Sequence, residues 1–352
     1  MIAIDGSPLV FGPFSVARML EGWLAGWPGL DEPDGPLLLL PSGDAPAGFP
    51  PEHVRRDDKP SPNARRFRSM LAGHVVGARA QGLLAPWMAV PDLRPFDVPV
   101  VAMVHELPWV RHGPIEGRRR MWSQKLWLQR ITERCAALLV PSEATRDDLV
   151  RAKPGLDERI RLVPHGFDPA PWKAARRAPD DPPYALMLGV GAGRAHARKK
   201  GLDVLLEAWP QAGLEGWRLV LVGEPALRVP AGVEVHAART GDALTDLVAG
   251  ASMLVYPSRM EGFGFPPLEA MAAGVPVLAT NAGSVPEVVG DAAHVVPAGD
   301  VVALVEGLRR VALDEMLRIE LQARGAAQAH AFPVETAAAR IVEAFATLGV
   351  RA

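Results

Sequence analysis

Short apolar runs separated by helical patterns most constrain how this chain can fold. The runs are continuous rather than alternating, as in "VPVVAMV" (98–104) and "YALMLGV" (184–190). Such runs are typical of parallel strands covered on both faces, so a doubly wound α/β fold is predicted. The other expected strands are 2–4, 37–40, 137–141, 161–164, 218–223, 233–238, 252–257, 275–280 and 293–297. The expected helices are 143–152, 201–209, 241–250, 267–273 and 302–312.

A segment rich in proline and charge, "DPAPWKAARRAPDDPPY" (168–184), divides the chain into two halves. Prolines hold such a segment extended, which predicts an interdomain linker at 169–183. The 352 residues then form two Rossmann-like domains, 1–168 and 184–332. Ligands of open α/β sheets bind beyond the carboxyl ends of the strands, so we expect the two domains to face each other across a ligand cleft. The last helix, 333–350, begins at Pro333 and can pack back on the first domain.

Composition narrows the class of protein. The net charge of -2 indicates no bias toward nucleic acid. The single cysteine, Cys135, fits a reducing compartment, and its setting "RCAALLVP" favours an inert core thiol. The start "MIAIDGSP" lacks the pattern of a signal peptide, and no apolar run approaches the roughly 20 residues of a membrane span. These features predict a soluble, cytoplasmic protein.

Two glutamates, Glu261 and Glu269, flank a glycine- and proline-rich stretch, "EGFGFPPLE". Pro266 and Pro267 suit the first turn of a helix, which places Glu269 near the third helical position. The backbone amides of Gly262 to Phe265 and of the first turn can then form an anion pocket. A carboxylate beside such a pocket is more suited to sugar hydroxyls than to phosphate. The alternative is a plain turn whose glutamate only favours the helix N-terminus.

A glycine cluster with basic residues, "GVGAGRAHARKKG", follows the expected strand 184–190. Its spacing is not that of a dinucleotide fingerprint. Arg194 and Lys200, just before a helix, can neutralise a diphosphate, Arg through its planar fork and Lys as a point charge. A solvated basic loop is the alternative.

The stretch "EGFGFPPLEAMAAGVPVLATNAGSVPEVVGDAA" resembles the signature of the retaining glycosyltransferases of family 4, which have the GT-B fold. The resemblance extends to "GRAHARKKGLDVLLEA", "LVPSEATRDDL" (139–149) and "RIRLVPHGFD" (159–168), and it covers most of residues 95 to 335. It implies an acceptor-side domain at 1–168 and a nucleotide-sugar donor domain at 184–332.

The resemblance also implies roles for individual residues. Glu261 would contact the donor-sugar hydroxyls near the reacting centre, and Glu269 the nucleotide ribose. Arg194 and Lys200 would grip the donor diphosphate. The backbone contacts implied are Gly262 and Phe263 to the sugar, and Gly264 and Phe265 to the diphosphate.

In the first half, His105 directly follows a strand in "VVAMVHELPW", where family members have a His-Asp-Leu stretch. The resemblance implies a catalytic-site histidine near the transferred sugar, although a lone histidine can equally be structural. Glu106 replaces the usual aspartate. Where the family has a glycine-rich turn, only Gly12 is available as a phosphate loop. His165 stands where asparagine is frequent.

The stretch 116–133, "EGRRRMWSQKLWLQRITE", carries five Lys/Arg and no acidic residue between Gly117 and Thr132. A basic, tryptophan-bearing amphipathic helix can lie on an anionic membrane, which suggests peripheral contact with the inner membrane face. An ordinary helix with core tryptophans is the alternative.

Taken with the resemblance, these motifs predict a retaining hexosyltransferase that moves a sugar from a nucleotide-diphosphate sugar to an acceptor hydroxyl. A sugar or lipid-linked acceptor in cell-surface polysaccharide, glycolipid or glycoconjugate synthesis is expected, with mannose the first guess. No cofactor or metal is expected, because no metal-ligand spacing or Asp-x-Asp pair is found. The alternatives are a GT-B sugar-nucleotide epimerase and a non-catalytic nucleotide-sugar-binding module. UDP, GDP and ADP are not distinguished, and the base is expected near Arg239 and Thr240.

Overall fold

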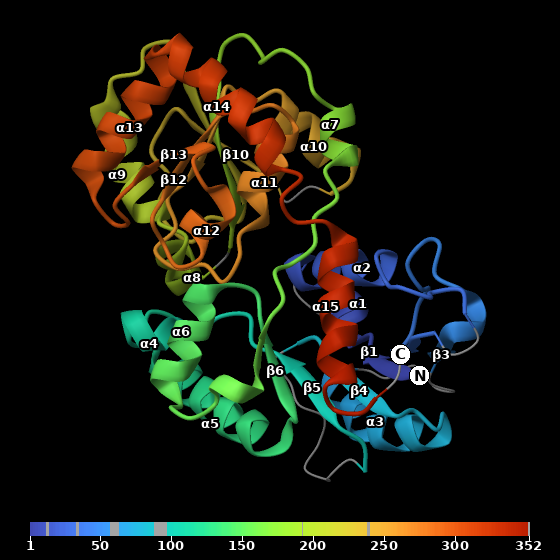
Figure 1. Ribbon diagram of the computed structural model, residues 1–352. Coiled ribbons are helices and arrows are strands. Elements are labelled where there is room, and N and C mark those ends of the chain that lie inside the picture. The colour runs from blue at the N-terminus through green and yellow to red at the C-terminus, as the bar shows by residue number, and fades with distance from the viewer. Residues whose placement is uncertain are drawn as a thin grey trace. The chain divides into compact units, whose positions relative to one another are not determined.

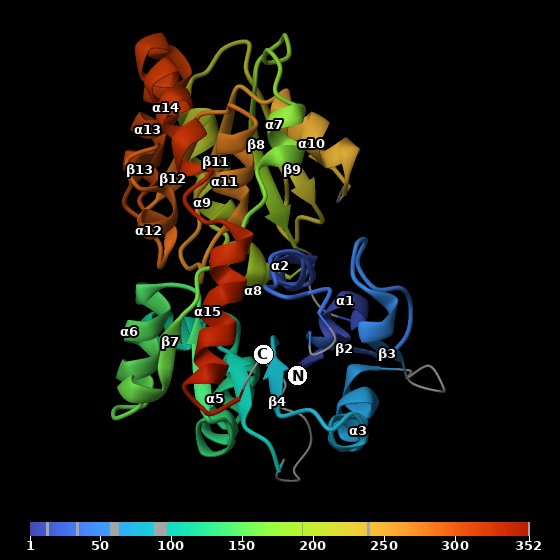
Figure 2. The same ribbon diagram turned by 45° about the vertical axis from the view of Figure 1, so that its right-hand side comes forward.

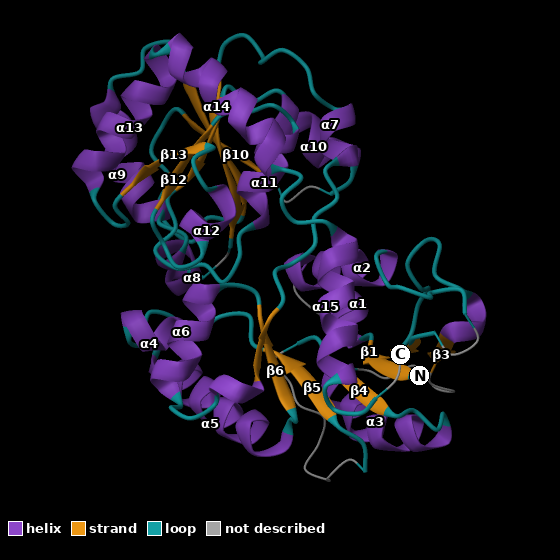
Figure 3. Ribbon diagram, viewed as in Figure 1, coloured by secondary structure: helices purple, strands orange, loops and turns teal. Residues whose placement is uncertain are grey.

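The chain forms two compact units in the computed structural model (Figure 1). The structure describes residues 1–11, 14–32, 35–56, 63–87, 97–191, 193–237 and 240–350. Unit 1 comprises Met1–Val110, Arg119–Phe167 and Phe332–Ala352, and unit 2 comprises Arg111–Arg118 and Asp168–Ala331. Each unit is built on its own parallel sheet with helices on both faces (Figure 3), so the predicted doubly wound α/β fold is confirmed.

The described part of unit 1 holds a seven-stranded sheet in the order β3-β2-β1-β4-β5-β6-β7, with all neighbours parallel. The chain starts in the middle of the sheet, moves outward through β2 and β3, and returns to the other side of β1 at β4. The strand order therefore reverses between β1 and β4, the place where such folds bind ligands. The strands are β1 (Ile2–Asp5), β2 (Leu37–Leu40), β3 (Val54–Arg56), β4 (Gly82–Ala85), β5 (Val100–Met103), β6 (Ala137–Val140) and β7 (Ile160–Leu162).

The helices of unit 1 pack on this sheet. Helix α2 buries one apolar face, with Met19, Leu20 and Trp23 at most 1% exposed. The helices are α1 (Ser7–Phe11), α2 (Phe14–Ala25), α3 (Ala64–Gly77), α6 (Glu143–Ala152) and α15 (Val334–Ala346), while α4 (Pro108–His112) and α5 (Arg118–Arg134) flank the segment that belongs to unit 2. Two single turns, Pro51–His53 and Asp157–Arg159, are 3₁₀.

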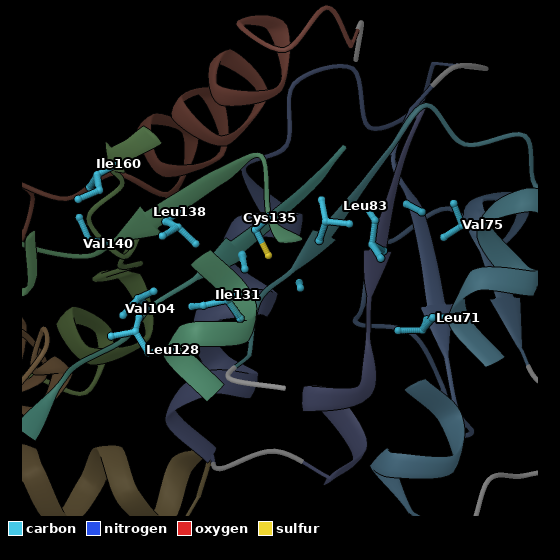
Figure 4. Close-up of a cluster of buried hydrophobic side chains, with 14 of the residues drawn as sticks. Leu71, Val75, Leu83, Val104, Leu128, Ile131, Cys135, Leu138, Val140 and Ile160 are labelled. Carbon is cyan, nitrogen blue, oxygen red and sulfur yellow. The ribbon is translucent and has the colours of Figure 1, made fainter. Parts of the chain in front are cut away.

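Figure 4 shows the core on one face of this sheet, where side chains of α3 and α5 meet those of the strands. Cys135 lies in this cluster, 2% exposed, between α5 and β6. Burial raises the pKa of its thiol to about 12. The thiol therefore stays protonated and packs as a small apolar side chain, as the sequence predicted.

The C-terminal helix α15 belongs to unit 1 and lies against α2 (Figure 2). Glycines make the approach possible. A Cβ on Gly26, just after α2, would lie 2.5 Å from the backbone carbonyl of Val334, and one on Gly82, in β4, would lie 2.7 Å from the ring of Phe345. Phe345 is fully buried by this packing.

Unit 2 has a six-stranded parallel sheet over its described residues, in the order β10-β9-β8-β11-β12-β13. Here the order reverses between β8 and β11, which pair through Met253–Ala185 and Leu254–Leu186. Its strands are β8 (Tyr184–Val190), β9 (Arg218–Gly223), β10 (Val233–His236), β11 (Met253–Tyr256), β12 (Val277–Thr280) and β13 (Ala293–Val296). Its helices are α7 (Ala170–Ala174), α8 (Arg194–Lys199), α9 (Leu202–Ala212), α10 (Asp242–Ala249), α11 (Phe265–Ala272), α12 (Val285–Val289), α13 (Val301–Leu313) and α14 (Glu315–Gln328).

The linker prediction needs a correction. Residues 169–183 do not form a purely extended connector, because α7 occupies Ala170–Ala174 and packs against α10 and α11. Pro171 lies in the first turn, where the missing N–H costs nothing, and Trp172 is buried at 5% exposure. Prolines favour an extended segment, but a proline is also compatible with the first turn of a helix.

Replacing Phe345 by Ala should destabilise unit 1 by about 3–5 kcal/mol, because a fully buried aromatic side chain is lost and a cavity remains. Hydrogen exchange read by mass spectrometry should show faster exchange in unit 1 peptides. Glu343→Ala, an exposed position on the same helix, is the control and should leave exchange unchanged. Equal acceleration in peptides of both units would contradict the assignment of α15 to unit 1.

Candidate active site

The candidate site of unit 2 lies where its strand order reverses. The segment after β8 carries Lys200, and the loop after the neighbouring strand β11 carries Glu261. Because carboxyl ends of parallel strands meet at one edge of the sheet, residues 61 positions apart come together. The sequence assigned these two residues to different parts of the donor, but it did not predict their mutual contact.

Lys200 and Glu261 form an ion pair with two close contacts. The ammonium Nζ donates to Oε1 at 2.8 Å and to Oε2 at 3.0 Å. Ser258 adds a third bond, from its hydroxyl to Oε1 at 2.6 Å. The two charged side chains are only 19% and 8% exposed, so the pair is largely shielded from water. Lys200 also lies over the ring of Tyr256, 5.7 Å from its centroid.

The surroundings keep Glu261 ionised. Burial acts to raise the pKa of its carboxyl, but the charges of Lys200 and Lys199 and the hydrogen bonds from Lys200 and Ser258 outweigh it. The net effect is a pKa below the ordinary value of 4.5. At neutral pH the site therefore presents a buried carboxylate with fixed orientation.

The loop that carries Glu261 is held through its backbone. Ser284 donates from its amide and its hydroxyl to the carbonyl of Glu261, both at 3.2 Å, and from its hydroxyl to the carbonyl of Phe263 at 2.9 Å. Thr280 Oγ1 donates to the carbonyl of Ser258 at 2.5 Å. Gly283 has φ +53°, and a Cβ there would lie 2.3 Å from the carbonyl oxygen of Glu261. These contacts fix the loop before any ligand binds.

Helix α11 begins at Phe265, two residues earlier than predicted, with Gly264 as its N-cap at φ +103°. Glu269 is therefore the fifth helical residue and not near the third, as expected from the sequence. Pro266 and Pro267 carry no N–H, so Gly264 and Phe265 supply the amide donors at this helix start. Both were among the predicted diphosphate contacts. Glu269 is 2% exposed.

Arg194 and Lys200 lie at opposite ends of a short helix and not in one loop, which corrects the sequence-based interpretation. Arg194 is the exposed first residue of α8, and Lys200 is its C-cap. Six residues of α-helix span about 9 Å. Gly193, in the glycine cluster, is the N-cap of this helix.

Three residues near the pair were not predicted from the sequence: Ser258, Lys199 and Arg259. Ser258 and Arg259 lie two or three residues before the quoted glutamate motif, and Lys199 precedes Lys200, so proximity to the motifs is the available signal. The ammonium of Lys199 is 7% exposed and lies 4.0 Å from the carboxylate of Glu116, within the short segment of unit 2. Burial of this charge beside Glu261 strengthens the positive potential at the site.

In unit 1, His105 follows β5 and its Nε2 lies 2.8 Å from the carbonyl oxygen of Pro86, just after β4. A carbonyl oxygen only accepts, so in the neutral ring Nε2 carries the proton and Nδ1 is the acceptor. Burial lowers the pKa of His105 below 6.5, against the opposing effects of the Pro86 bond and Glu106. The histidine is therefore neutral at pH 7.

A second histidine, His165, lies beside His105, with ring centroids 5.6 Å apart. It is 5% exposed and packs edge-on against Trp23 at 6.1 Å. Burial, and then the neighbouring His105, lower the pKa of His165 well below 6.5. In this chain a neutral, packed histidine fills the position where the family often has asparagine.

Two predicted positions fall outside the described residues. These are Gly12, the possible phosphate loop, and Arg239, a possible base contact. Thr240, next to Arg239, is described and exposed.

Helix α5 does not bury both of its tryptophans. Trp122 is 65% exposed and Leu126, one turn later, is 50% exposed. Lys125 lies between Trp122 and Trp109, 5.4 and 4.9 Å from the two ring centroids. Only Gln124, Leu128 and Ile131 are buried along the helix. The alternative, an ordinary helix with core tryptophans, is therefore wrong for Trp122.

Within the described ranges, no helix is long and apolar enough to cross a membrane. In the same ranges, no three His, Cys, Asp or Glu side chains come together in an arrangement that could hold a metal ion.

Two family models match the chain, one over each half. Residues 30–171 match the model described as Glycosyltransferase Family 4, and residues 188–314 match Glycosyl transferases group 1. The second match contains the Lys200–Glu261 pair. The chain belongs to glycosyltransferase family 4. The predicted family is confirmed, and the two sheets are those of the GT-B fold.

Curated relatives agree with this assignment. The alpha-maltose-1-phosphate synthase of Mycolicibacterium smegmatis is 30% identical over 56% of this chain and 57% of its own length. The O-antigen chain mannosyltransferase B of Escherichia coli is 44% identical over 29% of this chain and 27% of its own length. The chain thus covers less than two thirds of the length of these relatives.

A solved structure matches the described fold over nearly its whole length. The Anabaena protein HepE, crystallised with UDP-glucose, superposes with a TM-score of 0.72 at 16% identity, over 98% of this chain and 99% of that one. At this identity the likeness shows the fold alone.

Breaking the ion pair should be costly for stability. Lys200→Met leaves the buried Glu261 carboxylate without its closest cation, and should lower the free energy of unfolding by about 3–5 kcal/mol at pH 7. The double variant Lys200→Met with Glu261→Met should recover much of the loss, because no buried charge is left unpaired. Urea unfolding measures both.

The Lys200–Glu261 pair also makes the free energy of unfolding depend on pH. Because folding lowers the pKa of Glu261, its contribution is complete above 4.5, the ordinary value, and is lost as the pH falls through the lowered value. The stability gap between the native chain and Lys200→Met should therefore narrow below that pH. A gap that stays constant down to strongly acidic pH would contradict an ionised Glu261.

Proposed function

We propose that this protein is a retaining, metal-independent glycosyltransferase that moves a sugar from a nucleotide-diphosphate sugar to an acceptor hydroxyl. The observation that carries the proposal is the buried, ionised Glu261, held by Lys200 and Ser258 beside the N-cap of α11. A site that places a cation, amide donors and a carboxylate together suits a ligand with a diphosphate next to a sugar.

The cations and amide donors of the site suit the negatively charged diphosphate of the donor. Lys200 uses two of its three donors on Glu261, so the third remains for a phosphate oxygen. The amides of Gly264 and Phe265, with Arg194 from the start of α8, supply further donors to the diphosphate. Gly262 and Phe263 lie beside the sugar.

The two carboxylates bind hydroxyls, since they would repel phosphate. Glu261 accepts from the hydroxyls of the transferred sugar, and Glu269 from the ribose. In unit 1, the Nδ1 acceptor of neutral His105 suits a further hydroxyl of the transferred sugar. A neutral imidazole is required for this role, because a protonated ring has no acceptor.

Retention is proposed to follow from front-face attack. The bond between the anomeric carbon and the phosphate oxygen breaks first, which leaves an oxocarbenium-like sugar. The acceptor hydroxyl attacks on the same face, and its proton passes to the departing phosphate. Lys200, Arg194 and the α11 amides stabilise the negative charge that develops there, which is the role a metal ion has in other enzymes.

The substrate class is proposed from the relatives. One is named an O-antigen chain mannosyltransferase, and the Anabaena structure holds UDP-glucose. Both support a nucleotide-sugar donor, with mannosyl transfer as the first choice. Synthesis of a cell-surface polysaccharide, glycolipid or other glycoconjugate is the setting that fits them, in the cytoplasm.

We further propose that α5 contacts an anionic membrane at its inner face, where a lipid-linked acceptor would lie. Trp122 and Leu126 are one helical turn apart and exposed, which gives the helix an apolar strip. The basic residues around this strip are Arg118, Arg119, Arg120, Lys125 and Arg130. Exposed tryptophan beside several cations suits the headgroup region of a bilayer.

Glu261→Gln should lower the transfer rate by about 10²-fold or more, because the variant keeps the shape of the side chain but removes the charge at the sugar. Glu269→Ala should weaken nucleotide binding more than it lowers kcat. Transfer is measured with a panel of UDP-, GDP- and ADP-sugars, and adding EDTA should leave the rate unchanged. Full activity of Glu261→Gln, or a rate that depends on added divalent metal, would contradict the proposal.

Membrane contact can be measured separately by vesicle flotation. The protein should float with vesicles that contain anionic phospholipid and stay unbound with purely zwitterionic ones. Trp122→Ala with Leu126→Ala should reduce the bound fraction severalfold, since the apolar strip is removed. The matched control is Gln129→Ala, on an exposed position of the same helix. Binding that ignores lipid charge would argue against this contact.

A further inference from the structure

Arg259, which stands between Ser258 and Glu261 in the chain, makes an unusual number of contacts for a loop residue. Its guanidinium donates from Nη1 to Asp203 Oδ1 at 2.5 Å and from Nη2 to Oδ2 at 3.0 Å. The same Nη1 also donates to the carbonyl of Arg198 at 2.6 Å. Its backbone amide donates to the carbonyl of Lys199 at 2.8 Å.

These acceptors surround Lys200 along the chain. Arg198 and Lys199 are the last residues of α8, and Asp203 lies in the first turn of α9. Lys200 is the junction between the two helices. A cation at carbonyls of a helix C-terminus is also favoured by the helix dipole. The Arg259 side chain therefore contacts the backbone before Lys200, at Arg198, and the Asp203 side chain after it.

The junction itself has little freedom to move. Gly201 has φ +72°, and a Cβ there would lie 1.8 Å from the carbonyl oxygen of Pro257. The α8–α9 turn thus lies directly on the start of the loop after β11. Arg259, two residues beyond Pro257 in the same loop, binds the two segments together.

We infer that Arg259 and Asp203 form a positioning clamp that sets the distance between Lys200 and Glu261. The effect of the clamp on catalysis rests on the proposed function, whereas its effect on the position of Lys200 does not. Arg259 does not touch the reacting atoms in this proposal. It holds the turn so that the ammonium reaches both carboxylate oxygens and the diphosphate at once. Lysine at 259 could not reproduce the planar, two-pronged contact with Asp203.

The first measurement is independent of activity. Acetic anhydride labelling at limiting reagent, read by peptide mass spectrometry, reports how firmly each lysine amine is held. In Arg259→Met the labelling rate of Lys200 relative to exposed Lys173 should rise severalfold, because the ammonium leaves its carboxylate. Asp203→Asn is the milder second variant, should Arg259→Met fold poorly, and should give a smaller rise. Arg324→Met, which removes another guanidinium of unit 2 bonded to carboxylates and a carbonyl, should give none.

The second measurement asks whether Arg259 acts through Lys200. Arg259→Met should lower kcat by about 10²-fold, as small misplacements of catalytic groups do. In a Lys200→Ala background the same change should cost little more, and Arg259→Lys should restore only part of the loss. Additive losses, or an unchanged labelling rate at Lys200, would overturn the clamp. A changed labelling rate without any sugar transfer would leave the clamp standing and overturn the proposed function instead.

Discussion

The ion pair between Lys200 and Glu261 is the interaction on which the rest of unit 2's site depends. Removing both charges from water is costly, and the cost is offset because the two side chains meet with short contacts and Ser258 satisfies a remaining lone pair. A buried pair of this kind tolerates little displacement. The backbone bonds from Ser284 and Thr280, the left-handed glycines 201 and 283, and Arg259 all restrict the same two loops. These restraints matter because any separation of Lys200 from Glu261 would leave a buried charge without its partner.

Much of the architecture follows from local sequence, and the exceptions have physical causes. The continuous apolar runs predict the strands nearly residue for residue, and the helix expected at 143–152 is α6. Strand β3, "VRR", was missed because an edge strand needs no apolar side chains. Strand β4, "GLLA", was missed because four residues starting with glycine carry too little pattern. Gly82 is there to admit Phe345 from the other end of the chain, a constraint that no local window contains.

For the site, too, local sequence predicts the residues but not the contacts between distant segments. Glu261, Lys200, Gly264 and Phe265 could be named from their motif and from the family resemblance. Their mutual geometry could not, because the contact between residues 61 positions apart comes from the order of strands β8 and β11. Local context also misplaced Glu269 by two helical positions. The double proline predicts a helix start at the prolines, whereas the first helical residue is Phe265. In unit 1, the tautomer of His105 depends on the Pro86 carbonyl and its neutral state on burial, and neither can be predicted from the local sequence.

The double proline at the start of α11 limits where the chain can accept an inserted residue. Neither proline has an N–H that could donate to a carbonyl one turn earlier. Helix α11 therefore cannot lengthen toward its N-terminus to absorb an inserted residue. An insertion between Glu261 and Phe265 would have to distort the loop and so move one glutamate relative to the other. The start of the helix therefore fixes the spacing of eight positions between Glu261 and Glu269.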